Sequence, residues 1–233
     1  MSDFWDGKPL VIAHRGYTKS APENSLLALQ AAIDIGCDAV ETDVQATQDQ
    51  VFILHHDPGI NGLPIGRTKY EQLPEENRPP RLQEFLEVAK GKIKLDIEIK
   101  HPGFEEEIVR AIVGQLGVHN YVITSFHDPT VAMVKAISPP VQTGLIFGSP
   151  RIQLNWENLF PFARVYRCQA DFIAPHFSLV TAGLVGRAQK RNLPVMLWTV
   201  NSERGMRRAL GDSRVGAIVT DDPARLKGLR LGS

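Results

Sequence analysis

The sequence has few cysteines, no long apolar run and no excess charge of either sign. Two cysteines, Cys37 and Cys168, in 233 residues are too few for a disulfide framework and fit a reducing, cytoplasmic setting. The 26 basic and 26 acidic residues cancel, so no global field attracts nucleic acid or anionic lipid. No apolar run reaches the roughly 18 residues of a membrane span, and the acidic first residues differ from a signal peptide. We therefore expect a cytoplasmic globular protein.

Short apolar segments alternate with longer amphipathic segments along nearly the whole chain. The expected strands cover residues 10–14, 39–44, 94–100, 122–126, 143–147, 171–175, 195–200 and 217–220. The expected helices cover residues 25–35, 82–90, 104–116, 129–137, 179–191 and 202–210, with a broken helix within 152–167. This alternation predicts an α/β fold, a TIM-like (β/α)8 barrel that forms a single domain over residues 1–233. The alternative, an open doubly wound sheet, is disfavoured because the chain has no glycine-rich dinucleotide turn.

One apolar segment, residues 51–55, follows the second strand too closely to be another barrel strand. A parallel crossover needs about a dozen residues or more, so this segment is expected to fold back as an antiparallel hairpin arm. A short rim loop rich in proline and glycine, residues 57–80, comes next. Asn24 and Gly36 are expected to cap and to end the helix between them. Asp221 and Asp222 are expected to cap a helix that begins at Pro223.

Three acidic residues interrupt apolar strands at the ends where a barrel of this kind carries its chemistry. Glu41 and Asp43 are two residues apart and share one face, and Glu98 lies on the next barrel strand. An unpaired acid inside an apolar strand is costly, so three at matching depth indicate a ligand. Carboxylates without a cysteine cluster favour a hard divalent cation, Mg²⁺ or Ca²⁺, over zinc. Asp96 lies deeper on the same face and is interpreted as structural, or as support for the site.

Histidines and cationic residues end the strands around the same opening. His14 ends the first strand and His56 ends the hairpin arm, so the two form a candidate general acid/base pair. Arg15 and Lys100 add positive charge, which favours an anionic substrate, phosphate being the commonest such group. Lys100 also fits the role of a counter-ion to the acidic residues. Trp198 stands at the end of another strand, where it fits either an edge of the site or a packing residue.

These motifs follow a fixed order along the chain. They are His14-Arg15-Gly16, Pro22-Glu23-Asn24-Ser25, Glu41-Thr42-Asp43-Val44, His56-Asp57, Ile97-Glu98-Ile99-Lys100, Ser125-Phe126, Trp198-Thr199-Val200-Asn201 and Thr220-Asp221-Asp222-Pro223. In this combination the chain resembles the glycerophosphodiester phosphodiesterase family from about residue 10 to residue 226. The resemblance implies a TIM-like barrel that hydrolyses glycerophosphodiesters to glycerol 3-phosphate and an alcohol, with one divalent cation.

Carried over by position, the resemblance implies a role for each candidate residue. The metal ligands would be Glu41, Asp43 and Glu98, the catalytic acid/base pair His14 and His56, the phosphate-binding residues Arg15 and Lys100, and the residue at the glycerol end Trp198. The segment 58–78 is shorter than the insertion that the family usually carries there. This departure predicts a more open mouth and leaves the specificity for the leaving alcohol undetermined.

Three other functions are compatible with such a barrel. A lysophospholipase D would act on single-chain lipids and would need an apolar rim, of which Ile60, Leu63 and Ile65 offer only a little. A non-catalytic barrel that binds phosphorylated polyols is disfavoured because every expected catalytic residue is present. A sugar-phosphate isomerase would not need three carboxylates beside two histidines. The expected partner is a small-molecule glycerophosphodiester, and no helix face indicates an oligomeric state.

Overall fold

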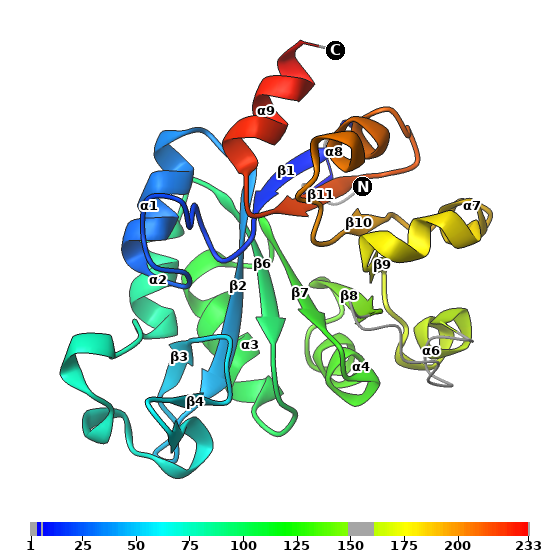
Figure 1. The fold of residues 1–233 in the computed structure, drawn as a ribbon. Helices are drawn as coiled ribbons and strands as arrows, with labels where there is room; N and C mark the ends of the chain where they lie inside the picture. Colours follow the sequence, from blue (N-terminus) through cyan, green and yellow to red (C-terminus); the bar gives the residue numbers. More distant parts are fainter. Residues whose placement is uncertain (1–3, 6, 149–160, 233) are drawn as a thin grey trace.

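The computed structural model describes residues 4, 5, 7–148 and 161–232, which form a barrel of parallel strands (Figure 1). These strands are β1 (Leu10–Ala13), β2 (Ala39–Ala46), β6 (Lys94–Ile99), β7 (Tyr121–Ser125), β8 (Gln142–Phe147), β9 (Phe172–Pro175), β10 (Met196–Leu197) and β11 (Ala217–Thr220). Their hydrogen-bonded order is β10-β11-β1-β2-β6-β7-β8-β9. Parallel bridges from Ile173 to Val195 and from His176 to Trp198 connect the two ends of this order, so the ring is nearly closed. The predicted (β/α)8 barrel is confirmed.

Helices cover the outside of the barrel. They are α1 (Leu26–Asp34), α2 (Leu82–Ala89), α3 (Glu105–Leu116), α4 (Asp128–Ile137), α6 (Pro161–Cys168), η4 (Phe177–Ala182), α7 (Leu184–Gln189), α8 (Glu203–Leu210) and α9 (Pro223–Leu231). One apolar cluster joins α1, α2 and α3 to β2 and β6, and a second joins α7 and α8 to β9 and β10. Removing these side chains from water is the main force that holds the helices on the barrel.

A third apolar cluster fills the barrel interior and its amino-terminal end. The Trp5 ring meets the Phe172 ring edge-to-face at 5.1 Å, and the Trp5 indole N–H donates to the side chain of Gln142. Gly144 makes room for this packing, since a Cβ at that position would lie 2.3 Å from the Phe172 ring. With this end filled by apolar groups, the buried acidic side chains of the interior gather toward the carboxyl ends of the strands.

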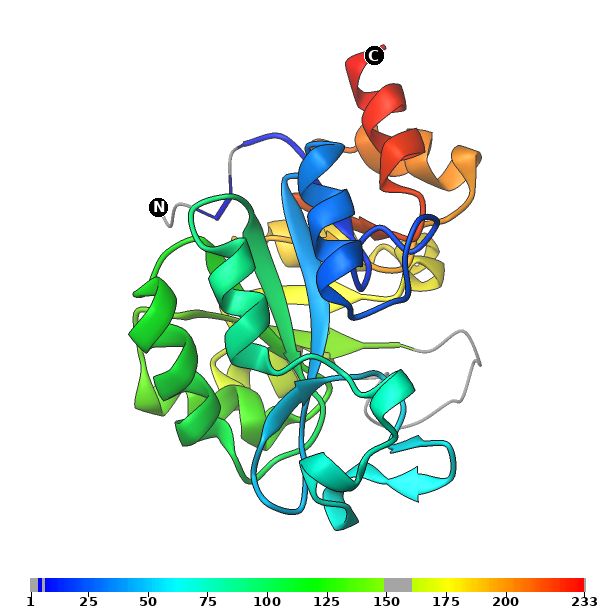
Figure 2. The same cartoon turned by 90° about the vertical axis from the view of Figure 1, so that its left-hand side faces the viewer.

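After β2 the chain turns back along the same strand. β3 (Phe52–Leu54) pairs antiparallel with β2, with Val44 opposite Leu54, which confirms the predicted hairpin arm. The rim loop then contains β4 (Gly59–Ile60), β5 (Leu63–Pro64), η1 (Ile65–Arg67), η2 (Tyr70–Gln72) and η3 (Glu75–Asn77). It packs around a small apolar cluster of its own. Figure 2 shows this segment, in cyan, beyond the end of β2.

Several expected boundaries differ from the structure. Gly183, whose φ of 71° is left-handed, divides the expected helix 179–191 into η4 and α7. The expected strand 195–200 is reduced to the two residues of β10. Within the expected broken helix, residues 152–160 lie outside the described residues, and α6 begins at Pro161.

The amino-terminal cap of α1 is Ser25, so the prediction that Asn24 caps this helix is wrong by one residue. Ser25 Oγ accepts the N–H of Ala28 at 3.1 Å. Asn24 instead has a left-handed φ of 53° and a buried side chain. Gly36, with a φ of 69°, ends the helix as predicted. The turn of the chain at Asn24 sends its side chain inward, toward the carboxylates of β2.

Candidate active site

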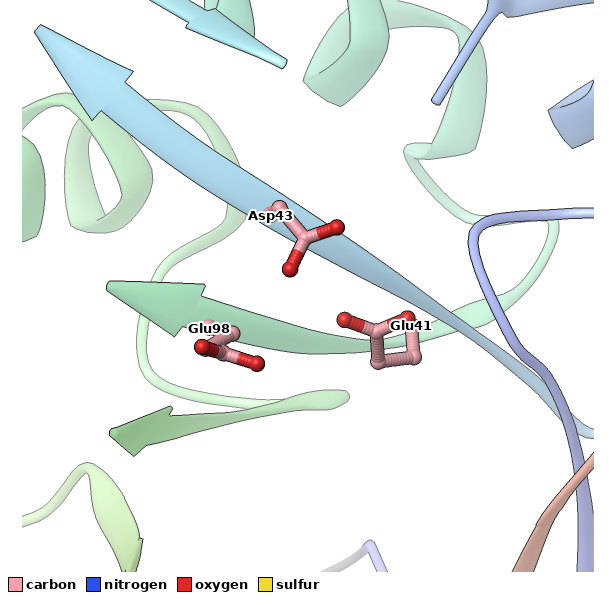
Figure 3. Close-up of side chains that lie close together, drawn as sticks. All are labelled: Glu41, Asp43 and Glu98. Carbon is pink, nitrogen blue, oxygen red and sulfur yellow. The ribbon is translucent and has the colours of Figure 1, made fainter. Parts of the chain in front are cut away.

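Three carboxylates converge at the carboxyl ends of two neighbouring strands (Figure 3). Glu41 and Asp43 project from the same face of β2, and the strand register places Asp43 beside Glu98 of β6. One oxygen from each of the three lies within 4.8 Å of the others. All three side chains are buried. The structure therefore brings together the residues that the sequence predicts as metal ligands.

The electrostatics of this triad favour a bound cation. Burial raises the pKa of Glu41 well above its usual range, and the neighbouring carboxylates Asp43, Asp96 and Glu98 raise it further. Burial also raises the pKa of Glu98, and the Lys100 ammonium offsets this only in part. When all three carboxylates are ionised, their negative charge exceeds the positive charge of Lys100 and Arg15, and a bound cation would balance it. Hard oxygen donors in this number are the ligands that Mg²⁺ and Ca²⁺ prefer.

Lys100 and Arg15 supply the positive charges of the site. Lys100 Nζ lies 2.9 Å from Glu98 Oε1 and 3.2 Å from Asp43 Oδ1. Burial alone would raise the pKa of Asp43, but Lys100 and Arg15 outweigh it, and that pKa lies below its usual value. Lys100 is therefore the counter-ion of the triad in the structure, one of the two roles that the sequence allows.

The backbone at Arg15 is bent into the site. With a left-handed φ of 56°, Arg15 donates its main-chain N–H to Glu41 Oε2 at 3.0 Å. Its guanidinium is paired with Glu23 through Nη1 at 2.9 Å. Its Nε lies 3.2 Å from Asp43 Oδ2 without hydrogen-bond geometry, and this buried N–H has no hydrogen-bond partner among the described residues. Such an unsatisfied donor beside the triad fits an acceptor supplied by a ligand.

Asn24 is a site residue that the sequence predicts only as a helix cap. Its amide donates to Asp43 Oδ2 at 2.9 Å and accepts from Thr42 Oγ1 at 2.8 Å. The amide oxygen also accepts the main-chain N–H of Asp43 at 3.2 Å. Asn24 therefore fixes the orientation of one carboxylate of the triad.

His14 is held between two carboxylates. Its Nδ1 lies 2.6 Å from Asp221 Oδ1, and its Nε2 lies 3.9 Å from Glu41 Oε2. Asn201 donates to the other oxygen of Asp221 and accepts the Asp221 main-chain N–H. The prediction that Asp221 caps α9 is therefore wrong. Asp222 alone does so as predicted, since its side chain accepts the N–H of Arg225 at 3.3 Å.

His56 lies between β3 and β4, at the start of the rim loop. Its Nδ1 is 2.9 Å from Asp57 Oδ1, and its side chain is about one-third exposed, at 37%. The ring is close enough to the triad that a positive charge on it would lower the pKa of Asp43 and oppose the rise at Glu98. The two histidines thus border the triad from different elements, as the sequence predicts.

The triad opens into a cavity at the barrel axis. Glu41, Glu98 and His14 line it together with Trp198, and it encloses about 330 Å³ of space, open solvent at its mouth included. Trp198 donates its indole N–H to the carbonyl oxygen of Ala174 at 2.8 Å and presents its ring to the cavity wall. Its ring is thus both a packing residue and part of the wall.

Asp96 lies on the floor of this cavity. Its carboxyl group accepts a hydrogen bond from Thr124 Oγ1 at 2.7 Å. Burial raises the pKa of Asp96 to about 7, although the bond from Thr124 acts in the opposite direction. This buried, paired carboxyl group agrees with the structural interpretation of Asp96.

Comparison with known proteins decides the family. The glycerophosphoryl diester phosphodiesterase family matches residues 14–225, nearly the whole chain. The chain belongs to this family. It is similar to the glycerophosphodiester phosphodiesterase of Caldanaerobacter subterraneus subsp. tengcongensis, with 29% identity over 94% of this chain and 96% of that one. It is also similar to that of Bacillus altitudinis, with 26% identity over 94% of this chain and 97% of that one.

Solved structures agree with this membership. An Oleispira antarctica phosphodiesterase in complex with the product sn-glycerol-3-phosphate is 25% identical, has a TM-score of 0.78, and matches over 97% of this chain and 98% of that one. A glycerophosphodiester phosphodiesterase from Parabacteroides distasonis shares the fold, with a TM-score of 0.79, 23% identity, and coverage of 100% of this chain and 99% of that one. The chain is therefore a glycerophosphodiester phosphodiesterase, a hydrolase of phosphoric diesters. No helix among the described residues is long and apolar enough to cross a membrane.

Proposed function

We propose that this phosphodiesterase cleaves glycerophosphodiesters to glycerol 3-phosphate and an alcohol with one divalent cation and a histidine acid/base pair. The observation that carries the proposal is the buried triad of Glu41, Asp43 and Glu98 beside His14 and His56. The Oleispira antarctica neighbour was solved with sn-glycerol-3-phosphate, which supports the same product here. The proposal also places the protein in the reducing cytoplasm, and the two free, buried cysteine thiols support this.

The triad is the proposed site of the cation, Mg²⁺ or Ca²⁺. A hard cation fits the three carboxylates because it prefers oxygen ligands. It also fits the electrostatics at Glu41, where neighbouring carboxylates outweigh the nearby positive charge. A cation bound there would supply charge neutralisation for a phosphate oxygen during cleavage. The residues do the positioning: Asn24 and the main-chain N–H of Arg15 hold Asp43 and Glu41 in place.

His14 is the proposed general base and His56 the proposed general acid. A carboxylate accepts hydrogen bonds only, so Nδ1 of His14 donates to Asp221 and its Nε2 carries the lone pair. This nitrogen takes a proton from the attacking oxygen. His56, which faces Asp57, donates a proton to the leaving alkoxide. An attack by water gives the products directly, whereas an attack by the substrate 2-hydroxyl passes through a cyclic phosphate, which ³¹P NMR detects.

Arg15, Lys100 and Trp198 are the proposed substrate-binding residues. The buried Nε–H of Arg15 has no hydrogen-bond partner among the described residues, and a phosphate oxygen would satisfy it. Lys100 lies at the same opening and is available to an anionic substrate once a cation replaces it as partner of the triad. Trp198 presents an apolar ring on the cavity wall, where it lines the glycerol end.

The lysophospholipase D alternative needs an apolar surface at the rim. Ile60 and Ile65 are only 5% and 1% exposed because they pack inside the rim loop, and Leu63 is 38% exposed. Within the described rim loop, one partly exposed leucine is a small surface for an acyl chain, so this part of the rim favours substrates without one.

The test is the release of glycerol 3-phosphate from glycerophosphocholine and glycerophosphoethanolamine, measured with Mg²⁺, with Ca²⁺ and with EDTA. The proposal predicts cation-dependent release that His56→Ala lowers by about 10²- to 10⁴-fold. Release that continues in EDTA would contradict the metal part, and near-parental turnover in His56→Ala would contradict the acid/base part. A parallel reaction with lysophosphatidylcholine separates the two substrate classes.

A further inference from the structure

The side chain of Gln45 holds both ends of the segment that carries His56. Gln45 is the next inward-facing residue on β2 after Glu41 and Asp43 and is only 3% exposed. Its Nε2 donates to the carbonyl oxygen of His55 at 2.6 Å and to that of Asp57 at 2.7 Å. One buried amide therefore bridges the main chain immediately before and immediately after His56.

The bridge made by Gln45 holds a segment that lies outside the helices and strands. Residues 55–58 belong to no helix or strand, so no ladder of main-chain hydrogen bonds fixes this part of the described chain. The main-chain N–H of His55 donates to the carbonyl oxygen of Asp43, which ties only the first residue of the segment to β2. On the far side of His56, the Pro58 carbonyl oxygen accepts the N–H of Ile65 within the rim loop, and Gln45 adds the tie to β2. It thereby connects the strand that carries two carboxylates of the triad to the loop that carries a histidine.

We propose that Gln45 is a positioning residue for His56. The hydrogen bonds from Gln45 to the carbonyl oxygens of His55 and Asp57 set the position of the His56 imidazole relative to Asp43 and Glu41, which lie on β2 with Gln45. The ring itself is paired with Asp57 and about one-third exposed, so its position depends on the main chain that Gln45 holds on either side of it. A displacement of about 1 Å in a catalytic group is enough to lower a rate by about 10²-fold. The inference rests on the proposed function, in which His56 exchanges a proton with the substrate.

The test is a double-mutant cycle between Gln45→Met and His56→Ala in the full chain, with kcat and KM measured on glycerophosphocholine. Methionine keeps the length of glutamine and removes both donors. We expect Gln45→Met to lower kcat by about 10- to 100-fold, with KM changed by less than about twofold. In the His56→Ala background the same substitution should cost less than about twofold, because the histidine that it positions is gone.

Two further variants keep the result interpretable. Gln142→Met removes a glutamine on β8 that accepts the indole N–H of Trp5 at the other end of the barrel, and should leave kcat near that of the parent. Gln45→Glu keeps the shape of glutamine and replaces two donors by acceptors, so it should repeat the loss if Gln45→Met does not fold. Circular dichroism and thermal melting report folding for each variant.

Each outcome decides the inference. A loss in Gln45→Met that is equally large in the His56→Ala background, or a loss matched by Gln142→Met, would overturn it and indicate a general structural role. Near-parental kcat in both Gln45 variants, beside an impaired His56→Ala, would also overturn it while leaving the proposed function intact. Near-parental kcat in His56→Ala would instead contradict the proposed function itself.

Discussion

Nδ1 of His14 donates a hydrogen bond of 2.6 Å to Oδ1 of Asp221, a residue 207 positions away in the sequence. The bond fixes the tautomer of the imidazole and turns its Nε2 toward the cavity, 3.9 Å from Glu41. Asn201 fixes the carboxylate in turn. A proton acceptor whose direction is set in advance is what a general base needs, because geometry comes before pKa in such transfers.

Replacing Asp221 by asparagine should therefore impair chemistry rather than binding. In Asp221→Asn the amide can donate to Nδ1 of His14, which places the ring proton on Nε2 and removes the lone pair of the proposed base. We expect kcat to fall by about 10²-fold or more, with KM little changed. The matched control is Asp222→Asn, which keeps an equally good helix cap and should stay within about twofold of the parent. Equal losses in the two variants would argue against the role of Asp221.

Lys100 should stabilise the fold most when the triad has no cation. Lys100→Met leaves Asp43 and Glu98 without their partner, and breaking a buried pair costs about 3 kcal/mol, or roughly 6–12 °C in melting temperature for a chain of this length. Thermal melting in EDTA should show this loss, and saturating cation should recover part of it. Lys135→Met, which breaks the pair with Asp171 away from the site, serves as the control. A loss in Lys100→Met that cation does not change would contradict the prediction.

Asp96 should make stability depend on pH in a predictable direction. Burial raises its pKa to about 7 from 3.8, so between these values the folded protein keeps a proton that the unfolded chain releases. The free energy of unfolding should then fall as pH rises from about 4 to about 7, by up to about 1.4 kcal/mol per pH unit. Asp96→Asn keeps an acceptor for Thr124 and lacks this penalty.

Urea unfolding in EDTA at pH 5 and pH 8 measures the effect of Asp96 directly. EDTA is needed because a bound cation alters the pKa of nearby carboxyl groups. The stability of Asp96→Asn relative to the parent should increase between the two pH values. An unchanged difference would show that Asp96 is ionised in the folded protein at both pH values.

The barrel was predictable because its parallel strands are short apolar segments separated by amphipathic helices. The triad followed from two local facts, the alternation of faces along β2 and the position of strand ends in such a barrel. Element boundaries were less accessible. The two-residue length of β10 and the division of the helix at Gly183 depend on tertiary packing and on a backbone conformation that composition does not reveal.

The missed site residues share a physical cause. Asp221 and Asp222 precede Pro223, and both fit the pattern of a helix cap. Their roles differ because Asp221 binds His14, which is 207 positions away in the sequence, whereas Asp222 caps the helix. Asn24 likewise fits the pattern of a helix cap in the sequence. In the structure its backbone is left-handed, and its side chain donates a hydrogen bond to Asp43 instead. Gln45 could have been predicted to face the site, because it follows Glu41 and Asp43 on the inward-facing positions of the same strand.

The most direct test of the account is the cation dependence of glycerol 3-phosphate release by the parent and by Glu98→Gln. The control is Glu105→Gln, which alters a buried carboxylate that bonds Thr130 outside the triad. The account predicts that EDTA abolishes release by the parent. Glu98→Gln should need at least about tenfold more Mg²⁺ or Ca²⁺ for half-maximal release, while Glu105→Gln follows the parent. Coincident curves for the parent and Glu98→Gln, or full release in EDTA, would contradict the proposal that this triad holds the cation.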